Sequence, residues 1–91
     1  MKTIWKFLLL AENIQYIIMP EDAEILTVQV QNGDPYIWVL VDPEKQNKER
    51  EIIAIGTGHI AGDGFGGKYI GTFQLLNGNL VFHIFDKGYK S

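Results

Sequence analysis

The chain has 91 residues, of which 46% are hydrophobic, and it carries a net charge of −3 at pH 7 with no cysteine. A chain of this length supports one hydrophobic core, so we expect a single domain over residues 1–91. The lack of cysteine excludes disulfides and cysteine-based zinc sites, and the acidic balance argues against binding of long nucleic acids, which needs a basic face.

Apolar runs in the sequence are short. None approaches the roughly 20 residues that span a bilayer. Lys6 interrupts the N-terminal apolar stretch, where a secretory signal needs a continuous one. The sequence therefore predicts a protein without a membrane partner or a cleaved leader.

Alternation of apolar and polar residues, with many β-branched and aromatic residues, dominates the chain. The first segment also contains helix formers, but Trp5 and Phe7 alternate with Lys6 and favour a strand. We expect an all-β fold of about seven strands, at residues 2–9, 14–19, 25–32, 35–42, 49–57, 68–76 and 79–86.

Two Asn-Gly sequences, within 32–35 and 77–79, predict tight hairpins. Asn-Gly accepts positive φ at both central positions of a turn. Short connections between successive strands predict a small antiparallel meander that closes as a β-sandwich or barrel.

The predicted strand 35–42 has no polar side. One side of the strand carries Tyr36, Trp38 and Leu40, and the other carries Ile37, Val39 and Val41. Both faces therefore need to be covered by other parts of the protein. The strand is either central in a closed sandwich or partly buried against a second subunit, and the second interpretation predicts a homo-oligomer.

Six of the ten glycines fall within residues 56–67, between two predicted strands. Such a cluster indicates positive φ angles or a close approach to the main chain, since glycine costs conformational entropy on folding. The loop is an anion cradle with donors from Thr57, His59 and Lys68, a mobile flap over a ligand, or a plain connection. The P-loop pattern is excluded, since Tyr69 replaces the Ser or Thr of that motif and a strand follows in place of a helix.

A second candidate site is a row of uncharged polar residues at alternate strand positions. Alternation along 68–76 places Tyr69 with Phe73 on one side and Thr72 on the other. The row is either a binding surface or an ordinary solvated face, and it comprises Gln29, Gln31, Thr72, Gln74 and His83.

Residues suited to catalysis are sparse. His59 and His83 are the two histidines, and no spacing links either one to a nucleophile, a carboxylate pair or a metal-ligand set. We therefore expect no enzymatic activity, no metal and no cofactor. A phosphodiesterase-like hydrolase ranks last among the functions considered.

Six segments, in this order, carry a resemblance to a known family: 3–7 (TIWKF), 28–33 (VQVQNG), 38–43 (WVLVDP), 56–59 (GTGH), 69–74 (YIGTFQ) and 80–85 (LVFHIF). They resemble short phage and prophage proteins that share a domain of unknown function. The resemblance spans nearly the whole chain and implies a phage gene product acting in the cytoplasm of the bacterial host.

Small oligomeric β proteins of phages include immune-signal sponges, which bind a host nucleotide messenger without cleaving it; this is an analogy of setting and size. The leading hypothesis is an anti-defence sponge that sequesters a phosphate-bearing nucleotide, such as a cyclic nucleotide or an ADP-ribose derivative. The alternative is a phage accessory or structural module that binds a protein, including a host enzyme. The expected ligand contacts are Gly56, Thr57, Gly58, His59, Arg50 and Lys68, with Trp5 or Trp38 stacking on the base.

Overall fold

Residues 1–90 are described by the computed structural model, which contains seven strands. Each predicted strand is confirmed, with ends displaced by up to three residues. Among the described residues no helix is long and apolar enough to cross a membrane. The strands are β1 (Thr3–Leu8), β2 (Ile14–Pro20), β3 (Glu24–Gln31), β4 (Asp34–Val41), β5 (Asn47–Gly56), β6 (Lys68–Leu75) and β7 (Leu80–Tyr89).

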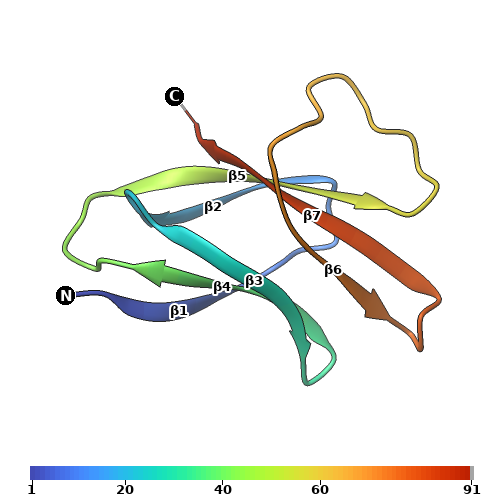
Figure 1. Cartoon of the computed structure of the whole chain (residues 1–91), viewed down its shortest axis with the longest axis horizontal. Coiled ribbons are helices and arrows are strands. Elements are labelled where there is room, and N and C mark those ends of the chain that lie inside the picture. Colours follow the sequence, from blue (N-terminus) through green and yellow to red (C-terminus); the bar gives the residue numbers. More distant parts are fainter. Residues whose placement is uncertain (91) are drawn as a thin grey trace.

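The strands form two antiparallel sheets that pack together as a sandwich (Figure 1). The first sheet has the order β1-β4-β3 and the second the order β2-β5-β7-β6. The all-β fold predicted from the sequence is therefore confirmed, and of the two predicted closures, sandwich or barrel, the structure forms the sandwich. Its connectivity is less sequential than a meander, because only β3–β4 and β6–β7 pair as hairpins and β1 and β2 join different sheets.

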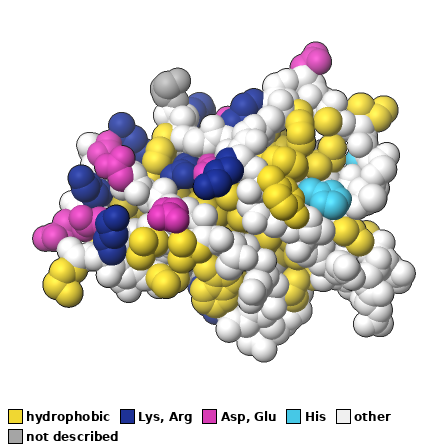
Figure 2. Space-filling view, viewed as in Figure 1, with side chains coloured by type: hydrophobic (Ala, Val, Ile, Leu, Met, Phe, Trp, Pro, Cys, Tyr) yellow, Lys and Arg dark blue, Asp and Glu magenta, His cyan; other side chains and the backbone are white. Residues whose placement is uncertain are grey.

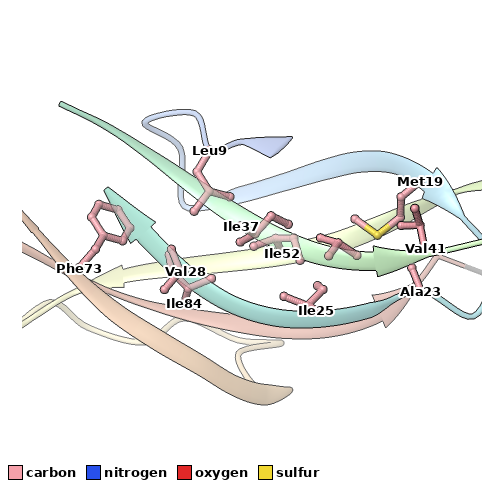
Figure 3. Close-up of a cluster of buried hydrophobic side chains, with 11 residues drawn as sticks. Leu9, Met19, Ala23, Ile25, Val28, Ile37, Val41, Ile52, Phe73 and Ile84 are labelled. Atoms are coloured by element: carbon pink, nitrogen blue, oxygen red, sulfur yellow. The ribbon is translucent and has the colours of Figure 1, made fainter. Parts of the chain in front are cut away.

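The core lies between the two sheets, where alternate strand positions point inward (Figure 3). Burying these side chains removes apolar area from water, the main driving force for folding. Ile37, Val39 and Ile52 have no exposed surface, and Val41 and Ile84 are 1% exposed. These residues fix the orientation of β4, β5 and β7.

The strand without a polar side, β4, is the central strand of the first sheet. Its inner residues are buried, whereas Tyr36, Trp38 and Leu40 are half-buried on the outer face. Lys6 covers part of that face, with Nζ 4.6 Å from the ring centroid of Tyr36 and 5.7 Å from that of Trp38. The chain itself thus supplies partial cover for both faces of β4.

Both hairpins form, but the second turn begins earlier than predicted. Residues 32–33 make a two-residue turn with φ of 52° and 86°. In the second hairpin the N–H of Gly78 donates to the carbonyl of Leu75, and the central residues are Leu76 and Asn77, with φ of 52° and 55°. A leucine therefore occupies a backbone conformation that favours glycine or asparagine.

A β-bulge in β6 makes the predicted faces of this strand wrong. The register with β7 shifts between Tyr69 and Gly71, and Tyr69 lies on the same outer face as Thr72, to which it is hydrogen-bonded. Gly71 faces the other sheet, where a Cβ would lie only 2.8 Å from Cγ1 of Val28. Glycine inside a strand is the sequence signal for such a bulge or close approach.

Candidate functional site

The glycine loop, residues 57–67, connects the end of β5 to the start of β6 and is the widest loop in Figure 1. Turns 56–59 and 62–65 are each closed by a hydrogen bond from the fourth N–H to the first carbonyl, at 3.0 and 3.2 Å. The third residue is Gly58 in one turn and Gly64 in the other, with φ of 83° and 80°. A type II turn requires positive φ at this position, which explains both glycines.

Inside the loop, His59 folds back onto Gly56. A Cβ on Gly56 would lie 2.7 Å from Cε1 and Nδ1 of the imidazole ring, so only glycine admits this packing. Gly56 itself is buried, whereas Thr57, Gly58 and His59 are exposed. The structure thus brings these four predicted contacts together at the first arm of the loop.

The second arm of the loop, residues 62–67, packs on the outer face of the second sheet through aromatic rings. Phe65 lies edge-on to Phe85 of β7, with ring centroids 4.8 Å apart. Tyr69 packs on the same ring at 5.5 Å. Ile53 of β5 is only 6% exposed although it lies outside the central core. A small second apolar cluster therefore lies outside the sandwich.

Between the loop and this outer face lies a hollow of about 250 Å³. Its size approaches the lower range of small-molecule pockets, about 300 Å³. Apolar side chains from the loop, β5 and the start of β2 dominate the wall, with a few polar groups among them: Ile14, Ile53, Ile55, Ile60, Ala61 and Phe65, with Asn13, His59 and Asp63. The sequence did not predict this apolar wall, because the wall forms only when the loop folds back over β5.

Beside the hollow, a chain of hydrogen bonds joins the start of the loop to the sheet. Thr57 Oγ1 lies 2.6 Å from Nε2 of His83, and Nδ1 of His83 lies 2.9 Å from Oγ1 of Thr72. The Tyr69 hydroxyl lies 2.5 Å from the same Thr72 oxygen. The arrangement pairs a hydroxyl with an imidazole, but no carboxylate joins it and neither Thr57 nor His83 lines the hollow. These hydrogen bonds hold the start of the loop against β6 and β7.

Arg50 does not belong to this site. Its side chain is 10% exposed, and its Nε and Nη2 donate to both carboxylate oxygens of Asp86 at 2.8 and 2.6 Å. Nη1 donates to the carbonyl of Ala23, and the guanidinium lies 4.4 Å from the ring centroid of Tyr89. Its donors therefore serve the protein itself, and we remove Arg50 from the predicted ligand contacts.

The ion pair changes the acid–base behaviour of both partners. Burial by itself raises the pKa of Asp86, but hydrogen bonds from Arg50 and the Gly88 N–H, with the Arg50 charge, hold that pKa below its ordinary value of 3.8. Burial likewise opposes the charge on Arg50, yet the bonds and charge of Asp86 raise the Arg50 pKa overall. Both groups are charged in the folded protein at neutral pH.

Two lysines lie at the second arm of the loop. Lys68, which was predicted, begins β6 opposite Asp86. Lys87, which was not, lies on β7, and its Nζ donates to the carbonyl of Gly64. Both side chains are exposed. No sequence pattern indicated that Lys87 lies beside the loop, because its position there follows from the bulge at the end of β7.

The predicted stacking residues lie elsewhere. Trp5 is on β1, 40% exposed and edge-on to Phe7 at 6.3 Å, and Trp38 is on the outer face of β4. Both belong to the first sheet, whereas the hollow belongs to the second. Phe65 is the aromatic residue that lines the hollow.

The predicted polar row is divided between two surfaces. Gln29 and Gln31 lie on β3 of the first sheet, and Gln31 accepts a hydrogen bond from Lys6. Thr72, Gln74 and His83 lie on the second sheet. One continuous binding face does not form from these residues.

Charge is distributed unevenly over the molecule. On the face seen in Figure 2, Lys, Arg, Asp and Glu side chains lie mainly over the left half and the upper centre. The region of the glycine loop at the right shows hydrophobic and histidine side chains, with an acidic side chain at its upper tip. Within residues 1–90 no group of three or more His, Asp or Glu residues could hold a metal ion. The candidate site is therefore mainly apolar, with cations at one border.

Comparison with known proteins identifies the class of this chain. Over residues 1–90 it matches a family described as "Domain of unknown function (DUF7352)". The chain belongs to this family. No match is found among curated proteins or among solved structures.

Proposed function

We propose that the protein is a non-enzymatic binding protein that holds a small nucleotide against the glycine loop. The observation that carries this proposal is the hollow between the loop and the outer face of the second sheet. Pockets for small ligands combine an apolar wall with a few polar groups that fix orientation. The isoleucines and Phe65 supply a wall for a planar base.

The unpaired main chain of the loop supports a phosphate contact. Within residues 1–90, two of the backbone hydrogen bonds made outside the strands have both donor and acceptor in residues 56–67. These two bonds close the two turns of the loop. Most loop N–H groups are therefore left for water or a ligand, and such groups form anion-binding nests. Lys68 and Lys87 border the same arm, so we place the phosphate there, beyond the apolar hollow.

Sequestration without reaction fits these residues better than turnover. The hydroxyl–imidazole pair of Thr57 and His83 lies outside the hollow and has no carboxylate partner. In the phage setting implied by the sequence resemblance, we propose that the bound nucleotide is a host immune signal. Holding it would block host defence and requires affinity without chemistry.

Purified protein mixed with cyclic dinucleotides, ADP-ribose derivatives and the matching nucleosides tests this proposal. Bound material is released by heating and identified by mass spectrometry. We expect one nucleotide to be retained and returned intact, with its nucleoside retained less. Loss of a charge-assisted hydrogen bond costs about 1.5–3 kcal/mol, so Lys68→Gln and Lys87→Gln should each weaken binding by roughly 10–100-fold.

Lys45→Gln is the matched control. Lys45 is an exposed lysine in the β4–β5 connection, paired with Asp22 rather than with the loop. It should bind like the unmodified protein. Retention of no compound in the panel, or equal weakening by all three substitutions, would contradict the proposal. Return of a cleaved product would instead indicate a hydrolase.

One observation favours a second candidate, a protein-binding module. Ile60 is 94% exposed in the loop. An exposed isoleucine beside an apolar hollow fits the surface of a partner protein. In that case Ile60→Ser would abolish capture of a host protein, and the nucleotide panel would return nothing.

A further inference from the structure

The strand β2 is an open edge of the second sheet. It pairs with β5 on one side and has no strand on its other side within the described chain. Residues 14–19 read Ile-Gln-Tyr-Ile-Ile-Met, without a single charge. Natural proteins protect exposed edges with charges, prolines or bulges, because an uncovered edge pairs with other strands. Here only Pro20, at the end of β2, acts in this way.

The hydrogen bonds at both ends of β2 show which backbone groups are free. Asn13 accepts a bond from β5 at one end, and Glu21 donates one to residue 46 at the other, both at 2.8 Å. Bonding residues alternate along an antiparallel strand. Even-numbered residues 14, 16 and 18 therefore point their N–H and C=O groups away from β5, toward solvent.

We propose that a second copy of this chain covers this edge by pairing its own β2 in antiparallel orientation. Tyr16 would lie opposite Tyr16 of the second copy, on the two-fold axis, and Ile14 opposite Ile18. This register uses the free groups of residues 14, 16 and 18 in both copies, and it leaves Pro20, which has no N–H, outside the ladder. The four-stranded sheet would continue into its symmetry mate.

The side chains along this side are those of an interface. Ile14, Tyr16 and Ile18 are 49%, 47% and 63% exposed. Lys90 makes a cation–π contact with the Tyr16 ring at 4.9 Å. Tyr16 is 47% exposed even with this contact present. Because the segment is uncharged, the proposed register brings no like charges together between the two β2 strands.

The strand β1 does not extend this apolar surface. β3 packs along β6 at one side of the sandwich, so β1 and β2 share the other side. Ile4 and Leu8 of β1 pair with Leu40 and Tyr36 and therefore face outward from the first sheet. Ile14, Tyr16 and Ile18 face outward from the second sheet, because the residues between them point into the sandwich. The proposed contact is therefore made edge to edge, by the β2 ladder and by these three side chains on one face of the continued sheet.

The mass in solution tests the proposal without any ligand. Light scattering with size-exclusion chromatography over a range of concentrations should give twice the mass of one chain. Ile18→Lys places lysines in the proposed interface and should shift the protein to monomer, with an unchanged β-sheet circular dichroism spectrum. Leu76→Lys is the control, since Leu76 is 68% exposed in the β6–β7 turn, and it should remain dimeric.

Cysteine cross-linking tests the register, because the natural chain has no cysteine. Opposed Cα atoms in a hydrogen-bonded antiparallel pair are about 5.5 Å apart, within disulfide range. Tyr16→Cys should therefore form a covalent dimer on mild oxidation, whereas Ile18→Cys, displaced from its own copy along the strand, should not. A wild type with the mass of one chain at every concentration, or equal cross-linking of the two variants, would overturn the proposal.

Discussion

The role that the sequence predicts for Arg50 differs from the role that it has in the structure. In the sequence it is one of few cations near the glycine loop, and it was a reasonable partner for a phosphate. In the fold it lies on the inner face of β5, bound to Asp86 and to the carbonyl of Ala23. Strand alternation places Arg50 on the same face as Ile52, but the partner carboxylate comes from β7 and has no sequence signal.

This pair predicts a specific pH dependence. The pKa of Asp86 is lower in the folded protein than its ordinary value of 3.8. Near that pH the unfolded chain therefore binds more protons, so the contribution of the pair is complete above it and is lost as pH falls below it. Urea unfolding of the wild type at several pH values should show this loss.

Asp86→Asn removes the charge and leaves Arg50 buried without a counter-ion. Breaking a buried ion pair in this way costs about 3–5 kcal/mol of unfolding free energy. The variant should also lack the part of the acid-dependent slope that Asp86 supplies. Asp63→Asn, in the exposed loop, is the control and should retain both stability and slope; parallel pH profiles for all three proteins would contradict the assignment.

At the scale of elements, the strands could be predicted and their irregularities could not. Alternation of apolar residues identified the seven segments, because most of the strands bury one face against the other sheet. The hairpin at 76–79 was placed one residue late, since Asn77-Gly78 has the stronger local preference. The bulge beside Gly71 reversed the face of Tyr69, because register depends on contact between sheets as well as on alternation.

The displaced turn predicts a stabilising substitution. Leu76 has φ of 52° and is 68% exposed, so it bears backbone strain and contributes little packing. Leu76→Asn should raise the free energy of unfolding by about 1 kcal/mol, the cost of the left-handed conformation for an ordinary residue. Leu80→Asn, at the regular start of β7, is the comparison in chemical denaturation and should give no gain. An equal effect at both positions would count against backbone strain.

The same limit applies to the candidate site as an element. Glycine clustering located the loop and predicted positive φ angles within it, because glycine adopts such angles without steric cost. The wall of the hollow on β5, made by Ile53 and Ile55, and the neighbouring Lys87 depend on how the loop folds over the second sheet. Local sequence does not contain that information.

For the whole molecule, the distance between the sheets is set on one side by Gly71. A Cβ there would lie 2.8 Å from Cγ1 of Val28, and the valine side chain has little freedom to rotate about χ1. Gly71→Ala should therefore lower the unfolding free energy by about 1–3 kcal/mol, as overpacked cores do.

Two further variants make this test specific. Val28→Ala in the Gly71→Ala background should restore part of the loss, because the two side chains then fit. Gly62→Ala, where a Cβ meets nothing within 4 Å and φ is not positive, should leave thermal unfolding nearly unchanged. Additive losses in the double variant would show that the contact between sheets is not the cause.

The position of the glycine loop outside the sandwich has a consequence for how the family can change. The buried side chains that hold the sheets together come from the strands and the β1–β2 and β2–β3 connections, and none of them lies within residues 57–67. Substitutions at 60–65 therefore alter the shape of the hollow while the folding of the frame is preserved. Related chains can diverge in what they bind by exchanging this one segment.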